Sequence, residues 1–392
     1  MSSSSFSYVL LRRGDTLELR RSVLLATPQG DSATPTTGTW KSSLKGQSSE
    51  PLHTHSVPRK TSSTAGVGGP RSGERASITS GASSSDDAPE GFRTVARLPL
   101  PMAYVTRYLW GTDKMRPNAF EVRAVDGSSS GVVHLDDSKA LDQWLRHIHN
   151  NVGHLNNKTL KMSNKYLHPS EHILHLGWVC EMDKEGESET LDLKQRWDPR
   201  FLILKGSDLC LFEQPPLNAD ELSHCVCSYK VYETLYRPAK EGERKDRRDC
   251  AFWIETSSPG VKHYLSVDNK SQLAALEQAW HRAVYQATRT FACNFEGKPC
   301  ALVLDVRQGF SLYDVVTKKY RWQYGFHDLK SSADDGKMRV QLTFRNSALP
   351  NEQDVKDLDC AELYPFVYSM HAFYLTRIIG IEPDFLKTAS AN

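Results

Sequence analysis

The sequence lacks several features that mark common classes of protein. It has 49 Lys and Arg against 47 Asp and Glu, a formal net charge of +2, so overall charge does not favour nucleic acid or a membrane surface as a ligand. No apolar run approaches the ~18 residues of a membrane-spanning helix. No basic-then-apolar signal peptide follows Met1. We therefore expect a soluble, intracellular protein.

Signatures of metal binding and catalysis are also missing. The eight cysteines include no Cys-x-x-Cys pair, so the spacing of a zinc site is absent and buried, reduced thiols are expected. The 14 histidines lie in no recognised Ser/Asp or Cys arrangement. No Gly-rich loop precedes a helix to hold phosphate. The sequence predicts no enzyme, no metal and no cofactor.

What the sequence does contain is a long internal repeat. Residues 119–152 and 251–284 share one apolar pattern at a constant offset of 132 residues (251 minus 119). Phe120 falls on Phe252, and the pattern changes from strand-like to helix-like at the same place in both copies. A repeat of this length predicts tandem copies of one β-rich module closed by a helix.

The chain before the repeat falls into two parts. Residues 8–15 are predicted to end a helix, with Gly14 as its C-cap, and a strand is predicted from Leu17 to Val23. Residues 26–91 are rich in Ser, Thr, Gly and Pro and carry few large apolar residues. Such a composition predicts a disordered linker.

From Phe92 onward the pattern predicts three sets of antiparallel strands, each closed by one amphipathic helix. The fold class is therefore mainly β with C-terminal helices (α+β). The first set has too few strands for the module, so we expect it to lack its N-terminal half. The predicted strands are Val95–Leu98, Ala103–Leu109, Ala119–Val125 and Gly131–Leu135 in the first set; Ile173–Met182, Arg200–Leu204, Leu209–Phe212, Val226–Tyr236, Phe252–Thr256 and Tyr264–Val267 in the second; and Cys300–Asp305, Gly309–Val315, Tyr320–Phe326 and Met338–Phe344 in the third. The predicted helices begin after Asp137 and span Lys270–Thr288 and Cys360–Ile379.

A strand set closed by a helix with an inward Trp resembles a pleckstrin-homology (PH) module. Several separated motifs further resemble the syntrophin family, particularly its gamma branch. These motifs are Tyr108-x-x-Gly111-Thr112-Asp113, Asn118-Ala119-Phe120-x-Val122-x-Ala124-Val125-Asp126-Gly127, Trp144-Leu145, Gly177-Trp178, the run from Lys319 to Lys337, and Asp384-Phe385-Leu386.

Syntrophins carry a first PH module split by a PDZ domain, then a second PH module and a unique C-terminal region. The resemblance implies a possible PDZ-end remnant in residues 1–25, the linker at 26–91 and the C-terminal half of a split PH domain at 92–156. It implies a complete PH domain at 173–290 and a unique PH/PTB-like module at 291–388. The Gly-Leu-Gly-Phe type loop that holds a ligand's carboxylate has no counterpart, so PDZ ligands are not expected. A truncated product and a variant isoform both fit this plan.

The resemblance implies a non-enzymatic adaptor that binds dystrophin- or dystrobrevin-like proteins. It would link the dystrophin-associated complex to membrane and cytoskeletal partners, in the cytoplasm at the inner face of the plasma membrane. The aromatic residues of the last helix do not fit one narrow stripe, which indicates a partner surface. Aromatic residues also alternate along one face of the predicted strand Tyr320–Phe326. There, burial in the core is the alternative to a partner surface. The candidate partner-binding residues are Trp322, Tyr324, Phe326, Tyr368 and Phe373.

The alternative function is a peripheral membrane module that binds phosphoinositides through its PH domain. Basic side chains from the first two strands and their loop would pair with phosphates. Acidic residues in the same loop, among them Glu185 and Glu187, oppose this and favour a solvated loop. The candidate phosphate contacts are Lys184, Lys194, Arg196 and Arg200.

Overall fold

The computed structural model describes residues 8–13, 15–22, 92–108, 117–182, 197–345 and 353–378. The linker predicted at 26–91 and the acidic loop after Met182 lie outside these residues. The chain divides into two units: unit 1 is Met1–Tyr108 with Arg116–Val152, and unit 2 is Leu109–Met115 with Gly153–Asn392.

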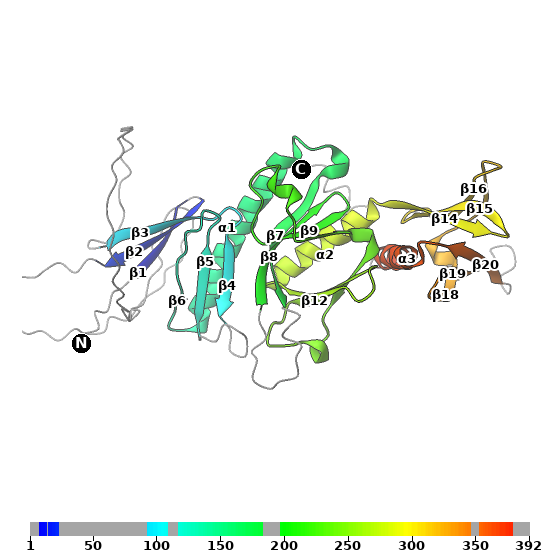
Figure 1. Ribbon diagram of the computed structural model, residues 1–392. Helices are drawn as coiled ribbons and strands as arrows, with labels where there is room; N and C mark the ends of the chain where they lie inside the picture. Colours follow the sequence, from blue (N-terminus) through cyan, green and yellow to red (C-terminus); the bar gives the residue numbers. More distant parts are fainter. Residues whose placement is uncertain are drawn as a thin grey trace, which may run out of the picture. The chain divides into compact units, whose positions relative to one another are not determined.

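Unit 1 contains two three-stranded antiparallel sheets and the first part of a helix (Figure 1). Leu17, Leu98 and Phe120 are buried, and the Phe120 ring stacks on Trp144 with centroids 6.5 Å apart. The elements are β1 (Tyr8–Arg13), β2 (Thr16–Ser22) and β3 (Phe92–Pro99) in one sheet, β4 (Tyr104–Tyr108), β5 (Ala119–Arg123) and β6 (Val133–His134) in the other, and α1 (Ser138–Asn164).

The helix predicted at residues 8–15 is wrong, because these residues form strand β1. A short apolar run fits a helix or a strand equally well, so its periodicity cannot decide between them. Strand β1 pairs with β2, and β2 pairs with β3, with Leu17 opposite Leu98. Residues 8–22 were expected to be separate from the module that begins at Phe92. They instead form one sheet with its first strand, β3.

Unit 2 begins with a module of seven antiparallel strands and one helix, here called the second module. Its strands follow the order β10-β9-β8-β7-β13-β12-β11, and α2 buries Leu276, Trp280 and Val284. The elements are β7 (Ile173–Met182), β8 (Trp197–Lys205), β9 (Asp208–Phe212), β10 (Cys227–Lys230), β11 (Thr234–Pro238), β12 (Ala251–Thr256), β13 (Lys262–Ser266) and α2 (Lys270–Tyr285).

The long strand predicted at Val226–Tyr236 is wrong. It is broken by a 3-10 turn, η4 (Val231–Glu233), between β10 and β11. Val231 and Tyr232 are both buried although they are neighbours in sequence. The chain turns here from one end of the strand order to the other, and an apolar pattern alone does not reveal such a turn.

The rest of unit 2 repeats this topology and is here called the third module. Its strand order is β17-β16-β15-β14-β20-β19-β18, so the predicted class of tandem PH-like modules closed by helices is confirmed. The sequence missed β14, β18 and β20. The elements are β14 (Thr288–Phe295), β15 (Lys298–Asp305), β16 (Gly309–Asp314), β17 (Lys319–Tyr324), β18 (Leu329–Asp334), β19 (Arg339–Arg345), β20 (Gln353–Cys360) and α3 (Leu363–Ile378).

Helix α3 closes the third module and also packs against the second. It contacts η4, β11 and α2. One continuous apolar cluster therefore runs from Leu202 and Trp280 of the second module to Phe310 and Phe373 of the third.

Candidate partner-binding surface

Helix α3 is buried on two sides. Toward the third module it buries Phe366, whose ring meets Phe291 edge-on at 5.4 Å, and Phe373, whose ring lies 6.4 Å from Phe326. Toward the second module, Thr376 is buried and its Oγ1 lies 3.0 Å from Nδ1 of His281 on α2. The helix is apolar around most of its circumference because both modules use it.

The contact between the second and third modules is reinforced by Arg289. Its guanidinium donates a 2.6 Å hydrogen bond to Glu233 and lies 3.7 Å from Glu362. It also lies 5.0 Å from the ring centroids of Tyr232 and Phe291. The planar guanidinium can stack on aromatic rings and donate hydrogen bonds to carboxylates at the same time, which suits a contact between two modules. We call the group His281, Arg289, Ser369 and Thr376, with their partners, the α3 seam.

The α3 seam is more polar than the cores on either side of it. Nε2 of His281 and Oγ of Ser369 are buried and have no hydrogen-bond partner among the described residues. Burial lowers the pKa of His281 from its usual value. Unpaired buried polar groups cost free energy, so the apolar contacts of α3 must offset that cost.

The aromatic residues of β17 lie at the edge of the third module's core. The Tyr324 ring stacks on buried Phe344 at 4.2 Å, and its hydroxyl donates to Asp354. Burial, aided by Asp354, raises the pKa of Tyr324 to about 12. Trp322 is half-buried, 5.9 Å from the Phe344 ring. These rings complete the module and leave part of their surface to solvent.

The five predicted partner-binding residues do not form one exposed patch. Phe326 and Phe373 are buried, whereas Trp322 and Tyr324 are half-buried. Tyr368 is half-buried as well, and burial raises its pKa, with Glu255 and Lys262 of the second module nearby. The structure thus brings Phe326 and Phe373 together beneath α3 and leaves Tyr368 near the second module.

Three exposed side chains of α3 were not among the predicted partner-binding residues. Tyr364, Tyr374 and Leu375 are 47%, 37% and 40% exposed, and His371 lies between them along the helix. His371 follows Tyr364 by seven residues, and Tyr374 and Leu375 follow His371 by three and four. This spacing places all four on one side of a helix. This spacing is visible in the sequence and indicates one exposed side of the helix.

Arg200 is the one predicted phosphate contact inside the described residues. Its Nε donates to Glu181 at 3.2 Å, and its Nη2 lies 3.8 Å from Asp198. The same Glu181 is 2.6 Å from Nδ1 of His263, whose Nε2 lies 2.9 Å from the Tyr229 hydroxyl. The Arg200 charge is therefore paired within the protein. Lys184, Lys194 and Arg196 lie outside the described residues.

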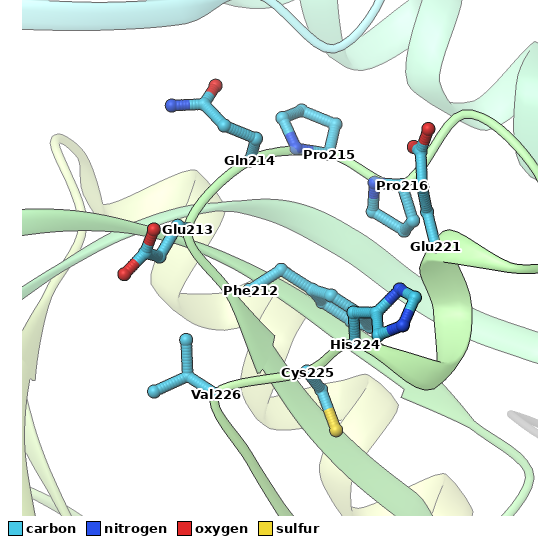
Figure 2. A pocket seen from close by; sticks show the side chains of 9 residues that line it. All are labelled: Phe212, Glu213, Gln214, Pro215, Pro216, Glu221, His224, Cys225 and Val226. Carbon is cyan, nitrogen blue, oxygen red and sulfur yellow. The ribbon is translucent and has the colours of Figure 1, made fainter.

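A pocket of about 410 Å³ lies in the second module beyond β9. Figure 2 shows Pro215, Pro216, His224 and Cys225 around it. Glu221, which also lines it, is engaged locally, since it accepts hydrogen bonds from the Leu217 amide and the Asn218 side chain. The lining shows no convergent polar set of the kind that orients a small ligand.

Within the described residues, no group of three or more His, Cys, Asp or Glu side chains is placed to hold a metal ion. The helices found in these same parts of the chain are all too short or too polar to cross a membrane.

Two seven-stranded sheets, each with its closing helix, define a protein built from tandem PH-like modules. Residues 284–382 match the family model of the syntrophin C-terminal PH domain. The chain is 32% identical to human gamma-2-syntrophin over 317 residues, which cover 75% of this chain and 57% of that protein. With human gamma-1-syntrophin it shares 30% identity over 295 residues, covering 74% and 56%. The chain is thus similar to syntrophins over most of its length, and residues 284–382 match the C-terminal PH domain of that family.

The chain spans little more than half the length of these two relatives. Among solved structures, it is similar to the C-terminal PH domain of human pleckstrin, with 15% identity over 29% of this chain and 80% of that one. The TM-score is 0.22, a likeness too small to carry an argument about function.

Proposed function

We propose that the chain is a non-enzymatic adaptor that docks a helical segment of a dystrophin- or dystrobrevin-like protein on the exposed side of α3. In this role it links the dystrophin-associated complex to membrane and cytoskeletal partners, in the cytoplasm at the inner face of the plasma membrane. The similarity to syntrophins supports the adaptor class. The exposed apolar side chains Tyr364, Tyr374 and Leu375 support the site.

The surroundings of α3 favour docking without rearrangement. The helix is held by Phe366 and Phe373 on one side and by Thr376 and His281 on the other. A surface that is already rigid loses little conformational entropy when it binds. An amphipathic helix laid along α3 would bury Tyr364, Tyr374 and Leu375 together, which is the usual way one helix recognises another.

The residues predicted from the sequence take supporting parts in this proposal. Phe326 and Phe373 hold α3 in place from the third module, and Tyr368 supports it near the second. Trp322 and Tyr324, which keep part of their surface exposed on β17, stay candidate contacts for the partner.

The test is a titration of the full chain with a C-terminal dystrophin fragment, followed by calorimetry. We expect Tyr364→Glu and Leu375→Glu each to weaken binding ~10-fold or more, because a charge would replace apolar contact at the centre of the interface. The matched control is Val316→Glu, at an exposed valine in the β16–β17 turn, which should bind as the unchanged chain does. Equal affinity for all three variants would refute the proposed site.

Phosphoinositide binding is the second candidate, and we propose it as a weak accessory contact. The paired state of Arg200 argues against a strong site, because an incoming phosphate would compete with Glu181 and Asp198. Binding to vesicles that contain phosphatidylinositol 4,5-bisphosphate should be weak and salt-sensitive. It should fall further in the Lys194→Ala/Arg196→Ala variant; tight binding that both substitutions leave unchanged would contradict this.

A further inference from the structure

The turn between β16 and β17 exposes apolar side chains next to lysines. Val315 and Val316 are 50% and 73% exposed, and Tyr320 near the start of β17 is 59% exposed. The residues between them, Lys318 and Lys319 included, are exposed as well. A turn without a buried residue stands out from the strands that it joins. Its two valines therefore add nothing to the core of the third module.

The conformation of this turn is fixed by Asp314. The Asp314 carboxylate accepts hydrogen bonds from the amides of Val316 and Thr317 at 3.0 and 2.8 Å. The carbonyl of Asp314 accepts one more from the Lys318 amide at 2.9 Å. Because the backbone is already ordered, the turn loses little conformational entropy when it binds a surface.

Basic side chains surround the exposed valines. The turn between β14 and β15 lies beside this one, because Arg321 of β17 donates a 2.6 Å hydrogen bond to Glu296 and lies 3.8 Å from Asp314. Arg321 thus engages both acidic side chains of the two turns. The other basic side chains there form no ion pair with a described residue; they are Lys298, Lys318 and Lys319. We call these lysines, with Val315, Val316 and Tyr320, the β16–β17 tip.

The corresponding connection of the second module lacks this combination. It joins β9 to β10 and also exposes apolar side chains, since Leu217 and Val226 are 59% and 53% exposed. It carries Glu213, Asp220 and Glu221, however, and neither Lys nor Arg from residue 213 to residue 226. The basic tip is therefore a property of the third module's own sequence and not of the fold that the two modules share.

We propose that the β16–β17 tip is a membrane contact whose ligand is a bilayer surface rich in anionic lipids. A turn that stands out can reach a flat surface but cannot enclose a small ligand. Its valine and tyrosine side chains enter the boundary between headgroups and acyl chains, and its lysines attract the lipid phosphates. This contact uses no residue of the partner site on α3. It also differs from the phosphoinositide contact of the second module, because it needs no pocket for one headgroup.

The test is co-sedimentation of the full chain with phosphatidylcholine vesicles, with and without roughly 30% phosphatidylserine. We expect binding to the anionic vesicles to be ~10-fold tighter or more, and to weaken as the salt concentration rises. Lys318→Glu/Lys319→Glu should lower the affinity ~10-fold or more, because attraction to the lipid becomes repulsion. Val315→Ser/Val316→Ser should lower it ~5-fold or more, because the apolar contact is lost without a change of charge.

Two matched controls lie in the second module and should keep the binding to anionic vesicles. Val226→Glu places a charge on the corresponding connection, and Lys194→Ala/Arg196→Ala removes the candidate phosphate contacts. Urea unfolding checks that the tip variants are folded; if one of the two is destabilised, the other decides. Val316→Glu should weaken vesicle binding and leave the binding of the dystrophin fragment unchanged, which separates this contact from the site on α3.

Four outcomes overturn the proposal. The first is no binding of the unchanged chain to anionic vesicles, which would mean that the tip faces a protein surface instead. The second is equal affinity of the unchanged chain and Lys318→Glu/Lys319→Glu. The third is undiminished binding by Val315→Ser/Val316→Ser, which would leave charge attraction alone. The fourth is an equal loss in either control, which would place the contact on the second module.

Discussion

At the scale of single residues, the charges buried in the second module set its response to acid. Burial alone would raise the pKa of the Glu181 carboxyl, but the His263 hydrogen bond and the nearby Arg200 outweigh it and hold this pKa below its usual value. A carboxyl with a lowered pKa in the folded state stabilises the fold above its unfolded pKa. That contribution is lost as the pH falls through the folded value. The second module should therefore lose stability as the pH falls below about 4.5, the unperturbed value.

The Glu181→Gln variant tests this. It removes the charge that faces Arg200 and His263, so we expect a loss of ~1–3 kcal/mol in the free energy of unfolding at pH 7. The variant should also show a smaller loss between pH 5 and pH 3 than the unchanged chain, since the titrating group is gone. Urea unfolding at these pH values measures both effects. Glu171→Gln, which breaks the exposed pair with Lys205, is the control and should stay within ~0.5 kcal/mol.

The sequence predicted some of these residues and could not predict others. The repeat register predicted that Phe120 and Phe252 are equivalent, and both are fully buried. It could not predict that His281 meets Thr376, because these residues are 95 positions apart and lie in different modules. The charge of Arg200 was visible in the sequence, but its pairing depends on strand register between β7 and β8.

At the scale of elements, α3 is the helix on which the two modules of unit 2 depend. Thr376 is 2% exposed and faces His281, whereas its neighbour Leu375 faces solvent. We expect Thr376→Glu to lower the free energy of unfolding by ~2–4 kcal/mol, because it buries an unpaired charge in the α3 seam. Leu375→Glu should change stability little and weaken partner binding instead. Urea unfolding and calorimetric binding of both variants separate these effects; similar stability for the two would contradict the role of the seam.

Helices and hairpins were easier to predict than the order of strands. Helix α2 follows from its apolar spacing, and the turn at Asp334-Asp335-Gly336 follows from its residues, with Gly336 at a φ of +67°. The pairing of β2 with β3 joins residues that are 81 positions apart (98 minus 17). No local pattern carries that information, so residues 8–22 were assigned to the wrong neighbours.

At the scale of the whole molecule, unit 2 is two modules with one core. The sequence predicts a boundary near residue 290 because strands begin again after α2, and strand β14 begins at Thr288. The shared core was not predicted, because the sequence of α3 shows only that it is apolar on more than one side. Phe291, Tyr232 and Trp280 belong to one cluster although they come from both modules. Modules joined in this way should unfold as one cooperative body.

A chain that ends at Thr288 tests this cooperativity, because it keeps every strand of the second module and removes α3. Its loss would expose Val231 and Tyr232 of η4 and leave Glu233 without Arg289. We expect the second module to lose ~3 kcal/mol or more in the free energy of unfolding, since several buried apolar side chains become solvated together. Hydrogen exchange at amides of β12 and β13 in both chains measures this, and amides of β5 in unit 1 are the internal control that should exchange equally.

If the β12 and β13 amides are equally protected in the two chains, the modules are independent. Failure of the shorter chain to bind dystrophin could then be attributed to the missing surface of α3 and not to a damaged fold.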